Sequence, residues 1–368
     1  MTNYSLMDHN ATEYPIVGTG LGFSPGILFH LFHLDGDRIE FRVTYTVAFV
    51  LEVIGVVMNI VSLSALYNIS RPVRPLQVLI IHLAAADLLF LVSGMVSTCL
   101  VLAEIYTPGM LGQQSPVWCV GEILIDVHIN CFPVPFIITT YIVLNQLLAL
   151  TFPLRYKAFV SKRRINVILG ISYVVVVVLF LTFHMVSLTQ GDSCLSHFSK
   201  TYINATSWYL GILCSVLILV NLLLYVGLFI KAKDIIRSHK GSFQLQEAQK
   251  ATANCATIDS RKDRKLLITI FLLSVTIVVL WTPAIVTFYL KTLIASRDFE
   301  ERIDLAVVQA ITGVVAILNS LVDPLVYGIR LPEVRAGYSR LMGNFRNCCR
   351  GPASQGGISR EATKSTSC

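Results

Sequence analysis

The sequence predicts an all-α membrane protein, built as a bundle of seven membrane-spanning helices with a short amphipathic eighth helix. Of its 368 residues, 54% are hydrophobic and only 14% are charged, and the mean hydropathy is +0.68. Soluble domains carry about 25% charged residues, so the surplus apolar side chains must contact lipid. The apolar residues also come in seven long stretches, each able to cross a bilayer as a helix. They lack the alternation of β-barrel strands.

These stretches are joined by more polar connections. After the last of them, apolar residues recur at helical spacing between arginines, which predicts a helix lying on the membrane surface over 331–347. The chain therefore divides into an N-terminal tail at 1–42, a membrane domain at 43–330, this surface helix and a tail at 348–368. Pro133 and Pro135 lie inside the third stretch and predict a bulge there, since each removes a backbone donor. The seven stretches are 43–67, 76–103, 120–151, 165–188, 208–230, 266–294 and 305–329.

The distribution of Lys and Arg predicts the orientation. Of 29 such residues, 23 fall in the loops at 68–75, 152–164 and 231–265 and after residue 329. Basic loops stay in the cytoplasm, so we expect a multi-pass plasma-membrane protein with its N-terminus outside and its C-terminus inside. Because the charges segregate by loop and form no single basic face, they argue against a nucleic-acid partner. The sequons at Asn3, Asn10 and Asn204 fall on the expected outer side and predict glycosylation.

Ionisable side chains within the spans are functional candidates, because their burial in lipid is costly. Glu52 either lines a cavity or is protonated and hydrogen-bonded, whereas Glu122 lies near the outer end of its helix and reaches water. Pro283 and Pro324 each open a helix and free a backbone carbonyl. The full set of candidates is Glu52, Asp87, Glu122, Asp126, Asp323, His82 and His128.

Several short motifs occur together in these spans. The chain carries Asn59, Leu83-Ala84-Ala85-Ala86-Asp87, Cys119, Leu148-Ala149-Leu150-Thr151-Phe152-Pro153-Leu154, Cys194, Tyr225, Trp281-Thr282-Pro283, Asn319-Ser320 and Asp323-Pro324-Leu325-Val326-Tyr327. In combination they resemble the rhodopsin-like G-protein-coupled receptors over about residues 43–346. The resemblance implies a receptor rather than an enzyme.

The same resemblance implies two local features, a disulfide and an ion site. Cys119 and Cys194 are expected to form a disulfide on the outer face. Asp87 and Asp323 match positions that surround an allosteric sodium ion or, alternatively, a water cluster, and no other cofactor is expected. Pro135 departs from this pattern, since the family has a serine there. Cys348 and Cys349 follow the surface helix and are expected to be palmitoylated, the alternative being inert thiols. The complete sodium set is Asn59, Asp87, Asn319, Ser320 and Asp323.

The resemblance fails at the end of the third span. Where the family has Asp-Arg-Tyr, this chain has Asn145-Gln146-Leu147, so the arginine is absent although its acidic partner is present as Asp263. Two interpretations follow: a G-protein-coupled receptor with a weakly restrained switch, or a receptor-like protein that does not couple productively, such as a decoy, a scaffold or an arrestin-only receptor. The other expected switch residues are retained: Tyr225, Trp281, Pro283, Pro324 and Tyr327.

The ligand position in the third span depends on how the family spacing is counted. Counting from Cys119 gives Asp126, and counting from Pro153 gives His128. The outer face carries more acidic than basic residues, which favours a small basic peptide through electrostatic steering, although the acids are also explained as a solvated surface. Ser and Thr in the C-terminal tail are candidate phosphorylation sites for arrestin recruitment. The expected pocket comprises Asp126, His128, Trp281, Phe288 and Tyr289.

A transporter, channel or membrane enzyme is disfavoured. The sequence shows no internal repeat, no nucleophile motif and no metal-ligand cluster. Ligand binding among the third, fifth, sixth and seventh spans is expected to favour outward movement of the sixth span about Pro283. This movement opens a cleft for a G protein or arrestin.

Overall fold

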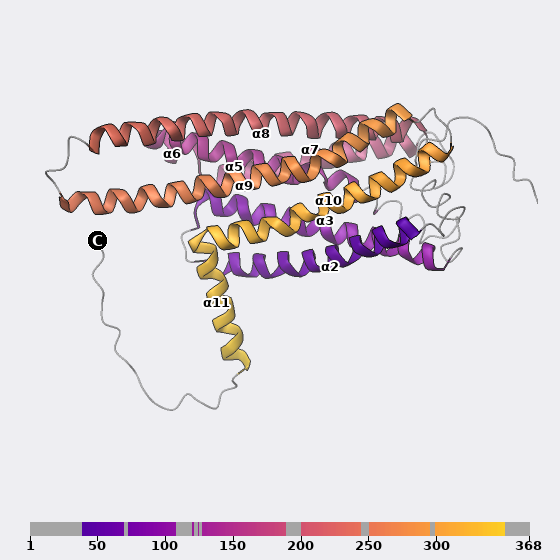
Figure 1. Cartoon of the computed structure of the whole chain (residues 1–368), viewed down its shortest axis with the longest axis horizontal. Helices are drawn as coiled ribbons and strands as arrows, with labels where there is room; N and C mark the ends of the chain where they lie inside the picture. Colours follow the sequence, from indigo (N-terminus) through magenta and orange to yellow (C-terminus); the bar gives the residue numbers. More distant parts are fainter. Residues whose placement is uncertain are drawn as a thin grey trace, which may run out of the picture.

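The long helices run side by side along the long axis of the molecule, and α11 crosses them near one end (Figure 1). The computed structural model describes residues 39–69, 73–107, 120, 124, 127–188, 200–243, 250–294 and 299–349. The helices are α2 (Ile39–Tyr67), α3 (Pro75–Tyr106), α5 (Pro133–Thr151), α6 (Pro153–Phe159), α7 (Lys162–Leu188), α8 (Lys200–Phe243), α9 (Lys250–Ile294), α10 (Phe299–Arg330) and α11 (Pro332–Cys349).

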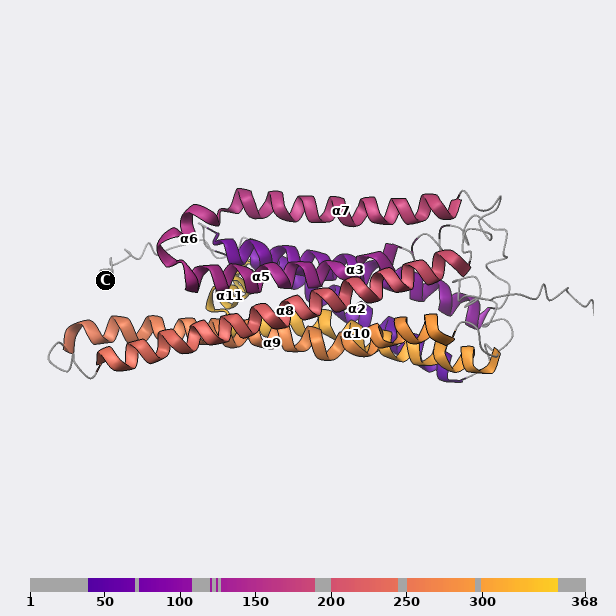
Figure 2. The same cartoon turned by 90° about the horizontal axis from the view of Figure 1, so that it is seen from above.

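The predicted all-α bundle is confirmed. Within the described residues, six helical segments are long and apolar enough to cross a membrane, and they correspond to α2, α3, α8, α9, α10 and the stretch Val127–Thr151 that ends in α5. The seventh, α7, has 27 residues, begins with three basic side chains and lies along one side of the bundle (Figure 2). In that view α9 and α10 lie on the opposite side, with α3 and α5 between.

The third span is interrupted at Phe132, between a helical segment at 127–131 and the start of α5. Pro133 has no N–H, so it cannot donate to the carbonyl of Ile129. The N–H of Phe132 donates to that carbonyl instead, at 3.2 Å. The irregularity expected from the prolines is therefore present, but it takes the form of one tight turn rather than a bulge.

The helices extend further than the apolar stretches that predicted them. The α8 helix begins eight residues before position 208, and α9 begins at Lys250 although its apolar stretch begins at 266. Helical hydrogen bonding continues beyond the apolar portion of each helix. Hydropathy detects only the apolar part and therefore misplaces these ends.

The core of the bundle is centred on Trp281, which is fully buried. Phe132 and Phe136 place their rings edge-on against it, at centroid distances of 4.1 and 5.1 Å. Large apolar side chains on the outer surface remain exposed, as at Val174 and Leu223. An apolar exterior of this extent fits a helix bundle surrounded by lipid.

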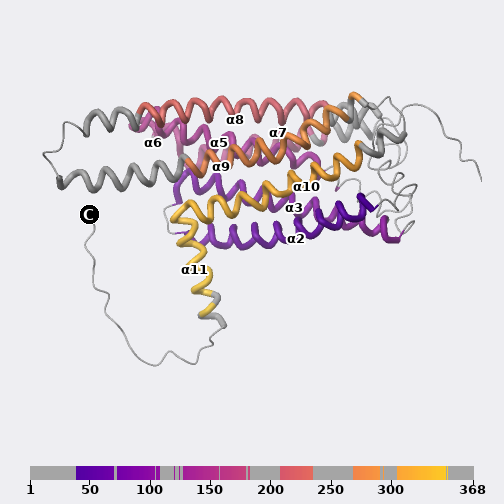
Figure 3. The backbone as a smooth tube through the Cα atoms, viewed as in Figure 1, coloured from indigo at the N-terminus to yellow at the C-terminus, as the bar shows by residue number. Residues whose placement is uncertain are grey.

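The amphipathic helix α11 turns across the end of the bundle and docks on α2 (Figure 3). The hydroxyl of Tyr338 lies 2.5 Å from that of Ser62. Gly337 lies so close to the backbone carbonyl of Ala65 that a Cβ at this position would clash with it. Arg340 donates to the carbonyl of Asn68 at 3.0 Å. The contacts fix the surface helix predicted over 331–347, which the structure places at Pro332–Cys349. We call the end of the bundle that α11 crosses the α11 end.

Candidate functional site

A cluster of polar side chains from α2, α3 and α10 lies buried in the bundle. The hydroxyl of Ser320 donates to Oδ1 of Asp87 at 2.9 Å. Nδ2 of Asn59 donates to the carbonyl of Ser320 at 2.9 Å and to that of Gly55 at 3.0 Å. Both Asn59 and Asp87 are fully buried. These bonds tie three helices together through side chains that the sequence had singled out.

The second carboxylate of the cluster lies on α10. Oδ2 of Asp323 accepts from Nδ2 of Asn319 at 3.3 Å. Asp323 lies one helical turn after Ser320, whose hydroxyl bonds Asp87. The structure thus brings together all five residues of the expected sodium set. Pro135, which stands in place of the serine, is buried within α5.

The cluster leaves several oxygen acceptors without a hydrogen-bond partner among the described residues. They are Oδ2 of Asp87, Oδ1 of Asn59 and Oδ1 of Asn319. A buried acceptor without a partner is costly, and two neighbouring carboxylates in lipid are costly unless protons or a cation neutralise them. Carboxylate and amide oxygens are the ligands that hard cations take. These oxygen atoms therefore suit a small hard cation as ligands.

Some of the expected pocket residues meet in an aromatic stack inside the bundle. The His128 ring stacks on Phe90 at a centroid distance of 4.4 Å, and Phe90 lies 5.6 Å from Trp281. Phe288 joins through Phe132, at 5.5 Å. Three of the expected pocket residues, His128, Trp281 and Phe288, are therefore connected by contact.

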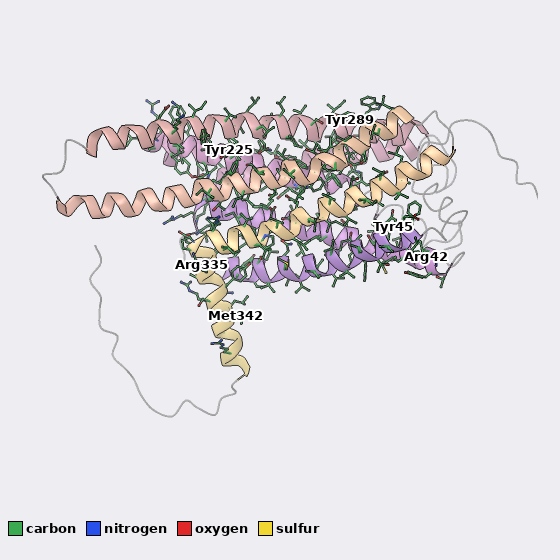
Figure 4. The ribbon with its side chains drawn as sticks, in the orientation of Figure 1. Arg42, Tyr45, Tyr225, Tyr289, Arg335 and Met342 are labelled. Carbon is green, nitrogen blue, oxygen red and sulfur yellow. The ribbon has the colours of Figure 1, made fainter. Side chains whose placement is uncertain are left out.

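Tyr289 packs against this aromatic cluster and also reaches α8. Its hydroxyl lies 3.0 Å from that of Ser215, and its ring packs edge-on against Trp208 at 5.7 Å. Figure 4 places Tyr289 and Tyr225 toward opposite ends of the α8–α9 pair. Tyr289 thus joins α8 to α9 on the side away from α11.

A third buried acid, Glu52, lies beside the stack, and the sequence did not show its partners. Glu52 is 2% exposed, and its Oε1 accepts from the hydroxyl of Thr98 at 3.2 Å. A Cβ on Gly94 would lie 2.6 Å from this Oε1 and 2.8 Å from Cε1 of His128. The acid and the imidazole therefore both lie against the bare backbone of Gly94. The presence of a glycine one turn before Thr98, on a helix that already carries Asp87, was the available signal.

Nδ1 of His128 lies 3.1 Å from the carbonyl of Phe90 and 3.3 Å from the hydroxyl of Ser93. A carbonyl only accepts, so Nδ1 carries the proton. Nε2 is therefore the ring nitrogen left to accept, or to donate when the ring is cationic. The ring is held to α3 by a hydrogen bond and by stacking.

The motif that departs from the family lies at the α11 end of α5. Oδ1 of Asn145 accepts from the hydroxyl of Tyr156 on α6, at 3.0 Å. Burial raises the pKa of Tyr156, so the phenol keeps its proton and stays a donor. Gln146 is 9% exposed and makes no hydrogen bond with any described residue. The backbone of Asp263 lies in α9, but its side chain is outside the described residues.

The two switch tyrosines are placed differently. The Tyr225 ring on α8 packs on Phe271 of α9 at a centroid distance of 5.0 Å. Tyr327 is fully buried, and its hydroxyl has no hydrogen-bond partner among the described residues. Pro283 and Pro324 lie inside α9 and α10, as predicted.

Several predicted sites fall outside the described residues. They include the proposed disulfide, the alternative pocket acid and two sequons: Cys119, Cys194, Asp126, Asn3 and Asn10. Asn204 lies in α8, and Cys348 and Cys349 are the last two residues of α11, but only the backbone is described at these three positions.

The comparison with protein families identifies the class. The family model of the 7 transmembrane receptor (rhodopsin family) matches residues 58–327, which is well over half of the chain. The chain belongs to this family, whose members are receptors rather than enzymes and signal through G proteins, and it is a multi-pass membrane protein. No curated protein matches the chain significantly.

Proposed function

We propose that this chain is a plasma-membrane receptor that binds a small basic peptide on its outer face and signals to a heterotrimeric G protein. The N-terminus lies outside and the α11 end lies in the cytoplasm. The observation that carries the proposal is the line of contacts from His128 through Phe90 to Trp281, two residues before Pro283. These contacts link the expected pocket to the part of α9 that bends most easily, next to Pro283.

The mechanism is a population shift between two packings of α9. Pro283 leaves the carbonyl of Val279 without its intrahelical donor, so α9 bends there more easily than elsewhere. Trp281 is enclosed by rings of the other helices and cannot change position alone. A ligand that contacts His128 and Phe288 therefore favours one arrangement of these rings. In that arrangement the cytoplasmic part of α9 moves outward and opens a cleft.

The remaining assignments belong to the same proposal. A sodium ion between Asp87 and Asp323 stabilises the closed packing, as the unpartnered oxygens there support. Cys119 and Cys194 form the outer disulfide, the sequons Asn3, Asn10 and Asn204 carry glycans, and Cys348 and Cys349 carry palmitate. Phosphate on the C-terminal tail recruits arrestin.

Ligand class is tested by binding to intact cells, which does not depend on coupling. We expect labelled short peptides rich in Arg and Lys to bind, and acidic peptides of equal length not to bind. Asp126→Asn should weaken binding at least tenfold, because the ligand then loses a charged hydrogen-bond partner. Glu333→Gln, at the α11 end, is the matched control and should bind as the wild type does. Equal binding of acidic and basic peptides would refute the peptide assignment.

Gln146 favours one alternative function. A neutral amide cannot form the ion pair with Asp263 that the family's arginine provides. A receptor-like protein that captures ligand without G-protein turnover would show the peptide binding described above and no nucleotide exchange.

A further inference from the structure

An apolar groove lies between α5 and α7, near the α11 end. Its walls come from α3, α5 and α7, and it opens onto about 510 Å³ of space free of protein atoms. The side chains that line it are mainly hydrophobic, so they offer water few hydrogen-bond partners. The principal lining residues are Leu79, Tyr141, Leu144, Leu148, Ile165 and Ile168.

One basic side chain lines the groove, Arg164, and two more precede it at the start of α7. Lys162, Arg163 and Arg164 are consecutive, exposed, and without an ion-pair partner among the described residues. Arg164 also lines the groove. Its Nη1 donates to the carbonyls of Ala158 and Phe159, which fixes the guanidinium at the mouth. Arg164 therefore brings a positive charge to the mouth of the groove, and the first turn of α7 adds two more exposed charges beside it.

The open side of the groove faces lipid. Ile168 is 43% exposed and forms part of the wall, and the next turns of α7 present Ile171 and Val175 to the exterior. The basic residues begin α7, at the level where the membrane meets water. A ligand that enters from this side must have an apolar chain for the groove and an anionic group for these basic residues.

We infer that the groove binds an anionic phospholipid of the cytoplasmic leaflet, with an acyl chain between α5 and α7 and the phosphate on Lys162, Arg163 and Arg164. Basic pockets between membrane helices on the cytoplasmic side suit such headgroups. The leaflet assignment rests on the orientation proposed above. Asn145 also lines the groove, so the bound lipid supports α5 next to Gln146.

The test uses the full chain in nanodiscs that contain the same lipids in both leaflets. Phosphatidylserine and phosphatidylcholine analogues with a photoreactive group on the acyl chain are compared at equal mole fraction. Cross-linked peptides are mapped by mass spectrometry. We expect the serine lipid to label the segments around Leu144–Leu148 and Ile165–Ile168 at least fivefold more than the choline lipid.

Two kinds of variant test the binding of the headgroup and the binding of the acyl chain separately. Lys162→Gln with Arg163→Gln should reduce labelling by the serine lipid about five- to thirtyfold, whereas Arg335→Gln on α11 should not. Ile168→Trp fills the groove and should abolish labelling there. Ile171→Trp adds the same bulk to the lipid-facing surface of α7 outside the groove and should leave labelling unchanged.

Equal labelling by both lipids, or labelling that persists in Ile168→Trp, would overturn the inference. Neither readout depends on ligand, G protein or the sidedness of the receptor. Failure here is therefore distinguishable from failure of the proposed function.

Discussion

Glycine at position 94 allows an acid from α2 and an imidazole from the third span to pack against the same point of α3. Glu52 and His128 both occupy the space that any other side chain at this position would need. His128 in turn stacks on Phe90 against Trp281. A small residue thus controls the geometry of the aromatic stack, although it carries no functional group itself.

Gly94→Ala should destabilise the receptor by about 1–3 kcal/mol, because the methyl group displaces either Glu52 from Thr98 or His128 from Phe90. Thermal unfolding of the purified protein measures the loss as a fall of several degrees in Tm. Gly313→Ala is the matched control, since its Cβ would meet nothing within 4 Å. Glu52→Ala should restore part of the loss in the Gly94→Ala background. An unchanged Tm in Gly94→Ala would show that the contact is not tight.

Asp87 is the residue on which sodium binding depends. Replacing an inert organic cation with sodium at constant ionic strength should raise the Tm of the wild type by a few degrees, because sodium binds the folded state. Asp87→Asn removes the charge and should abolish this sodium-specific rise. Glu52→Gln, a change at a buried acid outside the cluster, should retain it. A wild-type Tm that is the same in both cations would rule out the sodium ion in favour of the water cluster.

Among the helices, α11 is the one whose docking depends most clearly on a close approach of two backbones. Gly337 packs against the carbonyl of Ala65, Tyr338 bonds Ser62, and Arg74 pairs with Glu333 at 3.5 Å. The sequence predicted this helix from its amphipathic spacing. Its docking partner on α2 was not predictable, because a close backbone approach leaves only a glycine as its signal.

Gly337→Ala should separate α11 from α2, since the backbone of Ala65 cannot give way as a flexible side chain can. Hydrogen exchange of the amides in α11 measures the separation, and we expect faster exchange there with little change in α5. Gly343→Ala is the control on the same helix, because a Cβ at that position would meet nothing within 4 Å. The α11 amides of this variant should exchange as fast as those of the wild type. Protected α11 amides in Gly337→Ala would contradict this docking.

At the scale of the whole molecule, hydropathy predicted the seven spans and their order, because crossing a membrane requires long apolar helices. The sodium set was predicted through the family resemblance, and the structure does bring Asn59, Asp87 and Asp323 into one cluster. The turn at Phe132 and the bond between Asn145 and Tyr156 depend on geometry between elements. Single-sequence patterns do not encode such contacts.

The central claim is that the receptor couples to G protein although Gln146 replaces the arginine. Gln146 cannot form the ion pair with Asp263, and a loss of about 1 kcal/mol from the closed packing shifts the resting equilibrium toward the open packing by roughly fivefold. The open state should therefore be populated without ligand. Gln146→Arg can pair with Asp263 and should lower this resting population.

The most direct test is ligand-free nucleotide exchange by purified G proteins of several subtypes, with wild type and Gln146→Arg in nanodiscs at equal receptor concentration. We predict exchange above the receptor-free rate for at least one subtype in the wild type, and a lower rate with Gln146→Arg. A silent wild type together with an active Gln146→Arg variant would contradict the account, and would show that the natural chain receives ligand without passing the signal to a G protein.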